Sequence, residues 1–113
     1  MAGIGDIYSV KIFYEDDPSQ YKTRPVLVVD VEEELSLYTI AEITRTSPKN
    51  PPTYFDQFKE PIFDWRRAGL NSPSYVKTHK IHRVPEDKLL RYCGELGSNE
   101  LVRILNRIVD VNT

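Results

Sequence analysis

An arginine directly before an apolar run is the first residue in this chain that could do chemistry. Arg24 precedes Pro25 and the apolar run 26–29, and it follows a polar, acidic loop. A guanidinium is permanently charged and presents a planar fork of donors, which can hold a carboxylate or a phosphate in a way that a lysine ammonium cannot copy. The position predicts a fixed cation at the mouth of a sheet, suited to binding an anion.

Further polar side chains follow or flank the predicted strands. Their donors would suit an anion, and nearby aromatic rings could stack on exposed bases, although such rings more often anchor a core or a loop. The pattern favours single-stranded RNA as the ligand. The polar candidates are Arg24, Thr44, Arg45, Thr46, Ser47, Ser74, Lys77, Thr78, His79 and Lys80, and the aromatic candidates are Tyr21, Tyr54, Phe55 and Tyr75.

Motifs for other chemistries are missing from the sequence. It contains no glycine-rich phosphate loop, paired-cysteine zinc motif, helical metalloprotease motif or Gly-x-Ser-x-Gly elbow. His79 and His82 lie three positions apart in a strand-like segment, so they would point to opposite faces and could not share one metal. The sequence therefore predicts neither a metal nor a cofactor.

The composition indicates one compact domain over residues 1–113, because the chain is 40% hydrophobic and too short for two cores. The single Cys93 cannot form an intramolecular disulfide, no apolar run is long enough to span a membrane, and the start of the chain lacks the regions of a signal peptide. We therefore expect a cytoplasmic protein. The net charge of -2 argues against a surface coated with nucleic-acid-binding charge, so such a partner needs a local basic groove.

Alternation and residue type predict a mainly β fold. The segment 5–13 alternates, with Tyr8, Val10 and Ile12 on its apolar face. The segment 24–31 is almost continuously apolar, which indicates a central strand buried on both faces. Further strands are predicted at 35–43, antiparallel to the central one, and at 54–59, 75–84 and 89–96.

Two helices complete the predicted fold. The segment 61–69 opens with proline and closes with glycine, which predicts a short helix with Ile62, Trp65 and Ala68 toward the core. Ser98 is the expected N-cap of an amphipathic C-terminal helix. Six short strands and a terminal helix predict a small, strongly curved antiparallel sheet or a partly open barrel. The apolar positions of the terminal helix are Leu101, Ile104, Leu105, Ile108 and Val109.

Several short segments follow one another in a specific order. They are Gly5-Asp6-Ile7-Tyr8, Lys22-Thr23-Arg24-Pro25-Val26-Leu27-Val28, Ala41-Glu42-Ile43-Thr44, Ser74-Tyr75-Val76 and Gly94-Glu95-Leu96. Through almost its entire length, the chain resembles the MazF/PemK toxin family. The segment from Trp65 to Ser74 is similar to the Trp-x-x-Ala-Gly-Leu version found in PemK-like members.

The resemblance implies an SH3-like barrel with a C-terminal helix, a homodimer, and metal-independent, ribosome-independent cleavage of single-stranded RNA by a toxin that a small antitoxin restrains. The family's catalytic pair, the arginine of the Arg-Pro strand and the threonine that ends the next strand, matches Arg24 and Thr44 here. The strand after Ser74 supplies RNA contacts or acid-base groups in some members, which makes His79 a third catalytic candidate. The RNA-binding candidates are Arg45, Thr46, Ser74, Lys77 and Lys80.

Alternatives remain open at the level of sequence. The domain could be a catalytically silent SH3-like module that binds an antitoxin or nucleic acid, or a toxin that poisons a DNA-remodelling enzyme through the same fold. The acidic loop could hold Arg24 through Asp16 or Asp17 and so keep it from a phosphate. His79 and Trp65 could serve the structure alone.

Overall fold

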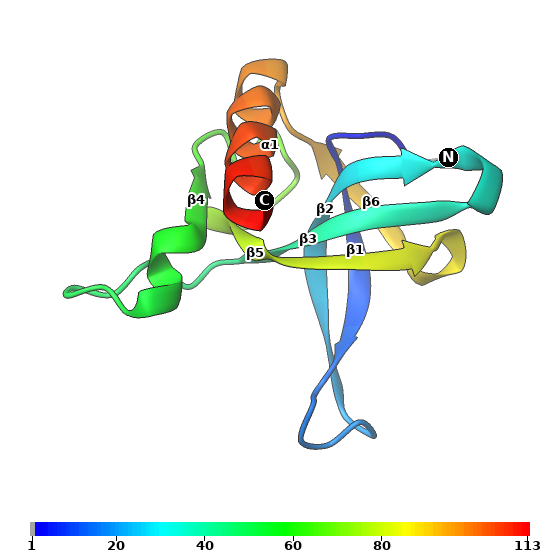
Figure 1. Ribbon diagram of the computed structural model, residues 1–113, viewed down its shortest axis with the longest axis horizontal. Coiled ribbons are helices and arrows are strands. Elements are labelled where there is room, and N and C mark those ends of the chain that lie inside the picture. The colour runs from blue at the N-terminus through cyan, green and yellow to red at the C-terminus, as the bar shows by residue number, and fades with distance from the viewer. Residues whose placement is uncertain (1) are drawn as a thin grey trace.

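The computed structural model describes residues 2–113, which form a curved sheet crossed by one α-helix (Figure 1). Five of the six strands predicted from the sequence and the terminal helix are confirmed, and the sixth strand of the sheet begins only at the end of the predicted segment 54–59. The strands are β1 (Asp6–Phe13), β2 (Tyr21–Glu32), β3 (Leu37–Thr44), β4 (Lys59–Ile62), β5 (Ser74–Pro85) and β6 (Arg91–Glu95), the helix is α1 (Ser98–Asn112), and three 3-10 helices are η1 (Glu33–Leu35), η2 (Tyr54–Phe58) and η3 (Glu86–Lys88).

All six strands form one antiparallel sheet in the order β4-β5-β3-β2-β1-β6. β2 lies inside the sheet between β3 and β1, and Val26, Leu27 and Val28 are fully buried. A strand covered on both faces needs apolar residues at consecutive positions, which explains the continuous run. The predicted central strand is therefore confirmed. Where β1 is joined to β2, the two strands extend as a hairpin that projects from the body of the molecule (Figure 1).

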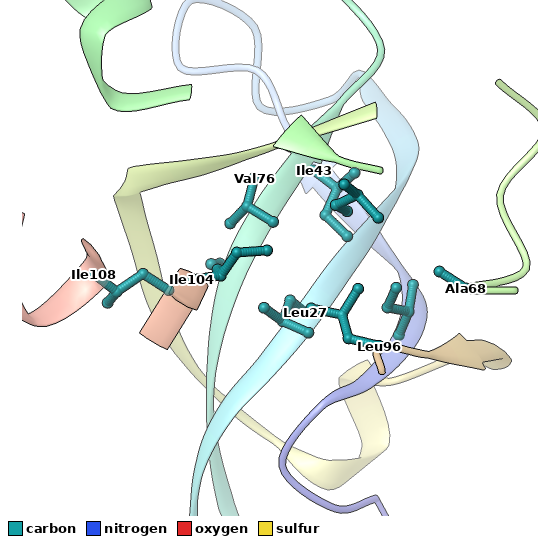
Figure 2. Packing of buried hydrophobic residues seen from close by; sticks show 10 residues of the cluster. Leu27, Ile43, Ala68, Val76, Leu96, Ile104 and Ile108 are labelled. Atoms are coloured by element: carbon teal, nitrogen blue, oxygen red, sulfur yellow. The ribbon is translucent and has the colours of Figure 1, made fainter. Parts of the chain in front are cut away.

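The curved sheet encloses two hydrophobic clusters. One lies under α1, whose Ile104 and Ile108 point toward the side of the sheet that carries Leu27 (Figure 2). Ile7 of β1 is fully buried in this cluster, which the alternation of β1 did not predict. β1 therefore separates the two clusters and contributes to both. Its predicted apolar face belongs to the second cluster: Tyr8, Val10 and Ile12.

The terminal helix differs from the prediction at its start and at one apolar position. Gly97 is the N-cap and Ser98 is the first helical residue. Ile104 is fully buried, whereas Val109 is 58% exposed. At about 100° per residue, Val109 lies about 140° around the helix axis from Ile104, which turns it away from the sheet. Within residues 2–113, no helix has the length and apolar character needed to cross a membrane.

The segment before β4 was predicted as a strand, and this prediction is wrong. Tyr54–Phe58 is the 3-10 helix η2, and β4 begins only at Lys59. A capping box fixes η2, because the side chains of Thr53 and Asp56 each accept a hydrogen bond from the other's backbone N–H. This Thr-x-x-Asp spacing outweighs the β propensity of the tyrosine and phenylalanines.

The helix predicted over 61–69 does not form. Pro61 instead lies in β4, where it pairs with Tyr75 of β5. Because β4 is an edge strand, the N–H that proline lacks is not needed for the hydrogen bonds of the sheet. A turn follows β4 and brings the chain back to the core. The three residues predicted to face the core do so: Ile62 and Ala68 are buried, and Trp65 is partly buried.

The turn after β4 closes the sheet against β6. A Cβ atom on Gly69 would lie 1.9 Å from the Cys93 carbonyl oxygen, and one on Gly94 would lie 2.3 Å from the Ala68 carbonyl oxygen. Gly69 also has φ 79°, a conformation that favours glycine. The β4 end of the sheet thereby meets its β6 end, and the predicted SH3-like small barrel is confirmed.

Candidate active site

Arg24 and Thr44 come from adjacent strands. Val26 of β2 pairs with Glu42 of β3 in the last pair of the ladder, and two residues beyond it lie Arg24 in β2 and Thr44 at the end of β3. Opposed residues of antiparallel strands share a face of the sheet, so the two side chains emerge side by side where the β2–β3 ladder ends. The strand order predicted from the sequence is what brings them together.

Two pockets meet at this pair of residues. One has a volume of about 750 Å³ and the other about 430 Å³. Arg24, Thr44 and Thr46 line both pockets, so we call these three residues the junction. The larger pocket also includes Lys22, Arg45, Ser74 and Arg91, and the smaller one includes Lys49, Phe55, Lys59, Lys77, His79 and Lys80.

A long bulge in β5 supplies one wall of the smaller pocket. Ala41 of β3 pairs with Ile81 and Ile43 pairs with Val76, so the single residue Glu42 stands opposite the four residues 77–80. Extra residues in one strand bend it and redirect its side chains. The bulge accounts for the presence of Lys77, His79 and Lys80 at the junction.

Arg24 is free of acidic partners. None of the carboxylates in residues 2–113 forms an ion pair with it. Asp17 instead accepts a hydrogen bond from the Ser19 hydroxyl at 2.6 Å. The alternative that the acidic loop holds Arg24 through Asp16 or Asp17 is therefore wrong, and the guanidinium faces the two pockets with its charge uncompensated.

The smaller pocket concentrates positive charge. Burial lowers the pKa of Lys77, and the charges of Arg24, Lys59 and Lys80 lower it further against the opposing effect of Glu42. A lysine whose pKa is lowered by neighbouring cations lies where a bound anion would relieve their repulsion. The pocket therefore suits a phosphate group.

Thr44 presents a hydroxyl from a buried position. The residue is only 4% exposed, and its Oγ1 accepts the Thr46 backbone N–H at 3.1 Å. Within the described chain this hydroxyl donates to no protein acceptor. Its proton is thus available to a ligand oxygen at the junction, beside the Arg24 guanidinium.

His79 belongs to a cluster of rings. It stacks on Phe55 with ring centroids 5.3 Å apart and lies 4.9 Å from the Phe58 ring. Its Nδ1 atom is buried without a hydrogen-bond partner. Burial lowers the pKa of His79, and the charges of Lys80 and Lys77 lower it further. The imidazole is consequently neutral at pH 7 and able to accept a proton.

Asp56 organises the loop that carries Lys49. Its Oδ2 accepts the backbone N–H groups of Lys49 and Thr53 at 3.0 and 2.8 Å, and its Oδ1 lies 3.0 Å from Lys59 Nζ. These donors hold the pKa of the buried Asp56 carboxyl far below its usual range. The carboxylate is thus engaged in fixing the loop, and its charge is paired with that of Lys59.

The predicted polar site residues gather around the junction, except Ser47 and Thr78, which line neither pocket. Thr78 is fully buried and donates to the Phe58 carbonyl at 2.6 Å, so it serves the structure. The Ser74 hydroxyl donates to the Ser72 carbonyl at 2.9 Å, which engages its proton. The residues that line one or both pockets are Arg24, Thr44, Arg45, Thr46, Ser74, Lys77, His79 and Lys80.

Several pocket residues were not predicted from the sequence. Lys49 and Lys59 lie far from β5 in the chain and reach the pocket because the capped loop and β4 fold beside it. Arg91 reaches the larger pocket from β6. The Thr53-x-x-Asp56 capping box was the one sequence signal for this loop.

The histidines do not share a metal site. His79 stacks on Phe55, whereas His82 Nε2 lies 2.6 Å from Glu42 Oε2. In the part of the chain that the structure describes, no group of three histidine, cysteine, aspartate or glutamate side chains could hold a metal ion. The pockets offer cationic and hydroxyl donors instead.

Comparison with known families matches the chain almost end to end. Residues 4–111 match the PemK-like, MazF-like toxins of type II toxin-antitoxin systems. The chain belongs to this family. The resemblance carried by the Arg24 and Thr44 segments is confirmed, whereas a search of curated proteins gave no significant match.

Solved structures of MazF proteins share the fold of this PemK-like chain. MazF in the MazE-MazF complex from Deinococcus radiodurans aligns with a TM-score of 0.72 at 12% identity, covering 97% of this chain and 94% of that one. A mycobacterial endoribonuclease, solved with its cognate antitoxin, aligns with a TM-score of 0.70 at 17% identity over 98% and 94% of the two chains. The Mycobacterium tuberculosis toxin MazF-mt6 aligns with a TM-score of 0.64 at 24% identity over 96% and 99%.

Proposed function

We propose that this PemK-like, MazF-like chain is a sequence-specific endoribonuclease that cuts single-stranded RNA without a metal or cofactor. The observation that carries the proposal is the junction, where Arg24 stands beside the Thr44 hydroxyl with no ion pair to a carboxylate in residues 2–113. A nucleic acid strand that runs from one pocket to the other carries a phosphate over this pair. One structural neighbour is itself named an endoribonuclease.

Cleavage through the ribose 2'-hydroxyl fits the groups at the junction. The 2'-oxygen loses its proton and attacks the adjacent phosphorus, the bond from phosphorus to the 5'-oxygen breaks, and that oxygen takes up a proton. The products are a 2',3'-cyclic phosphate and a 5'-hydroxyl. Arg24 stabilises the extra negative charge of the phosphorane, and the Thr44 hydroxyl donates a second hydrogen bond to it.

His79 is the candidate proton acceptor. It lines the same pocket as Arg24, and its lowered pKa keeps the imidazole neutral at pH 7. A neutral imidazole can take the proton of the 2'-hydroxyl. Arg45, Thr46, Ser74, Lys77 and Lys80 supply the contacts that hold the strand on both sides of the cut.

Digestion of a long single-stranded RNA in the presence of EDTA tests the proposal. We expect cuts at a recurring short sequence, with products that end in a 2',3'-cyclic phosphate and a 5'-hydroxyl. Intact RNA, or activity that disappears with the chelator, would count against it. A double-stranded RNA of the same sequence is the control and should remain uncut, because its bases are paired and stacked inside the helix and cannot be splayed into the pockets.

A catalytically silent module that binds only an antitoxin or nucleic acid is the second candidate. It fits the same fold, but it gives no reason for an uncompensated arginine beside a hydroxyl whose proton is unused. If the chain is such a module, the RNA in the digestion experiment should remain uncut, although bound protein should slow its migration in a gel.

The partners follow from the same proposal. The solved neighbours include a MazE-MazF complex and a toxin with its cognate antitoxin. We infer that this chain has its own antitoxin, that it acts as a homodimer, and that it works in the cytoplasm. Sedimentation of the isolated chain at the mass of a monomer at micromolar concentration would contradict the dimer.

A further inference from the structure

Two aromatic rings, Phe55 and His79, line the smaller pocket. Together with Tyr54 and Phe58 they form a cluster that we call the aromatic shelf (Tyr54, Phe55, Phe58 and His79). Phe55 and His79 are stacked, with an angle of 16° between their planes. Tyr54 contacts Phe55 and Phe58 edge to face, with centroid distances of 5.2 and 5.6 Å. Four rings from η2 and the β5 bulge therefore support one another beside the junction.

The outer rings of the shelf are exposed, although they are fixed in place. Tyr54 is 70% exposed and Phe55 is 58% exposed. Rings that merely anchored the loop would be buried, because exposing apolar surface gives up the free energy of burial. The capping box of Thr53 and Asp56 holds η2 and so holds these rings in their exposed position.

The charges around the shelf identify the kind of ligand. Lys49, Lys59, Lys77 and Lys80 line the same pocket, together with Arg24. The only carboxylate among the lining residues is Asp56, which is already engaged by Lys59 and two backbone N–H groups. Exposed aromatic rings among cations are what a single-stranded nucleic acid requires, because its bases stack while its phosphates are neutralised.

We propose that one nucleobase next to the cut phosphate stacks on Phe55, with His79 supporting the ring from the other side. The inference rests on the proposed cleavage of RNA and adds to it a base-binding site. Phe55 and the junction residues line the same pocket, so a strand with its phosphate at Arg24 has its neighbouring base within that pocket. Phe55 would then bind substrate rather than act in the chemical step.

Four variants separate stacking from other roles of Phe55. Phe55→Ala removes the ring, Phe55→Leu keeps apolar bulk without an aromatic face, and Phe55→Trp keeps the face. Phe63→Ala is the matched control, since Phe63 is 73% exposed but lines neither pocket. The substrate is a short RNA that spans one mapped cut site, and the measured quantity is kcat/KM.

We expect Phe55→Ala and Phe55→Leu to lower kcat/KM roughly 5- to 150-fold, the range for losing one stacked base. Phe55→Trp and Phe63→Ala should remain near the wild-type value. An abasic nucleotide at one position beside the cut should lower kcat/KM for the wild type but not for Phe55→Ala. Full activity in Phe55→Leu, or equal abasic effects in wild type and Phe55→Ala, would overturn the proposal.

A separate binding measurement keeps this inference distinct from the cleavage reaction. If the wild type cuts no RNA, a short single-stranded RNA that contains 2-aminopurine is titrated with wild type and with Phe55→Leu. Quenching of the 2-aminopurine fluorescence by the wild type alone supports the shelf even though the proposed cleavage fails. Equal quenching by both proteins, or none by either, overturns the shelf.

Discussion

Thr44 illustrates how a buried hydroxyl can act at the junction. Its Oγ1 accepts the Thr46 N–H, which orients the hydroxyl and leaves its proton for a ligand. The residue ends β3, where its backbone pairs with Tyr75 of β5, so its position is set by the β3–β5 ladder. A threonine in this place has less freedom than the same residue in a loop, which favours a preorganised donor.

Replacing Thr44 by valine preserves the shape and removes the hydroxyl. We predict that Thr44→Val lowers the cleavage rate about ten- to hundredfold, as expected for a lost hydrogen bond to a charged group worth about 1.5–3 kcal/mol. Thr44→Ser keeps the donor and should retain most of the rate. Single-turnover kinetics on one mapped cut site gives both values, and equal rates for the valine and serine variants would exclude the hydroxyl from the reaction.

The pH dependence of cleavage tests His79 as the proton acceptor. Its folded pKa is lowered from about 6.5, mainly by burial and then by the charges of Lys80 and Lys77, against the opposing Glu42. A base must be deprotonated, so the wild-type rate should rise with pH through this lowered pKa and level off by pH 7. We predict that His79→Asn loses this acidic limb and slows cleavage by at least about a hundredfold.

A control for His79 uses the other histidine. His82→Asn removes a histidine that pairs with Glu42 and lines neither pocket, so its rate should follow the wild-type pH profile. Persistence of the acidic limb in His79→Asn would show that another group accepts the proton.

At the scale of elements, the loop before β4 depends on one carboxylate. Asp56 binds two backbone N–H groups and Lys59, and together these fix η2 and the aromatic shelf. Because its pKa is lowered in the folded protein, the ionised form stabilises the fold. This contribution is fully present above the ordinary carboxyl pKa of about 3.9 and is lost as the pH falls below it.

The prediction for Asp56→Asn is therefore a pH-dependent loss of stability. At neutral pH the variant should melt at a lower temperature than the wild type, and the gap should narrow as the pH falls below about 4. Thermal unfolding from pH 2 to 8 measures the gap. Asp16→Asn, at an exposed position of the β1–β2 loop, is the control and should follow the wild type throughout. If the difference in melting temperature between Asp56→Asn and the wild type were the same at every pH, the charge of Asp56 would not be the source of the lost stability.

The elements also mark the limits of prediction from sequence. Strand β2 could be predicted because its continuous apolar run needs cover on both faces, and the position of Arg24 directly before this run followed from it. The bulge at 77–80 could not be predicted from the sequence, since it depends on the pairing of β5 with both β3 and β4. η2 was mistaken for a strand because its aromatic residues have high β propensity, while its capping box was the better signal.

At the scale of the whole molecule, charge is distributed unevenly. The net charge is -2, yet Arg24 and four lysines line one pocket. Asp56 is the only acidic residue among those that line it, and other acidic residues lie in exposed segments such as 15–17 and 33–34. Net charge from the sequence therefore gave no indication of a basic site, because the fold separates the charges. The local basic groove required for a nucleic acid partner is what the fold provides.

Closure of the barrel depends on two backbones in close contact. A Cβ atom on Gly94 would lie 2.3 Å from the Ala68 carbonyl oxygen, and neither backbone can move aside without opening the turn against β6. We predict that Gly94→Ala lowers the free energy of unfolding by about 1–3 kcal/mol, as overpacking does elsewhere. Urea denaturation measures it.

The control for Gly94 is Gly3→Ala. Gly3 is exposed, and a Cβ there would approach only Asp6 Oδ2, at 3.7 Å. This variant should unfold at the wild-type urea concentration. If Gly94→Ala also unfolds there, the contact between the turn and β6 does not hold the barrel closed.

The central claim is that Arg24 stabilises the charge that develops on a cut phosphate. The most direct test is the single-turnover cleavage rate at saturating protein, with EDTA present, for wild type, Arg24→Ala and Arg24→Lys. Loss of one preorganised donor costs about 10²–10³ in rate, so we predict that drop for Arg24→Ala and a partial recovery for Arg24→Lys, which restores the charge without the fork. A rate for Arg24→Ala within a fewfold of the wild type would contradict the account.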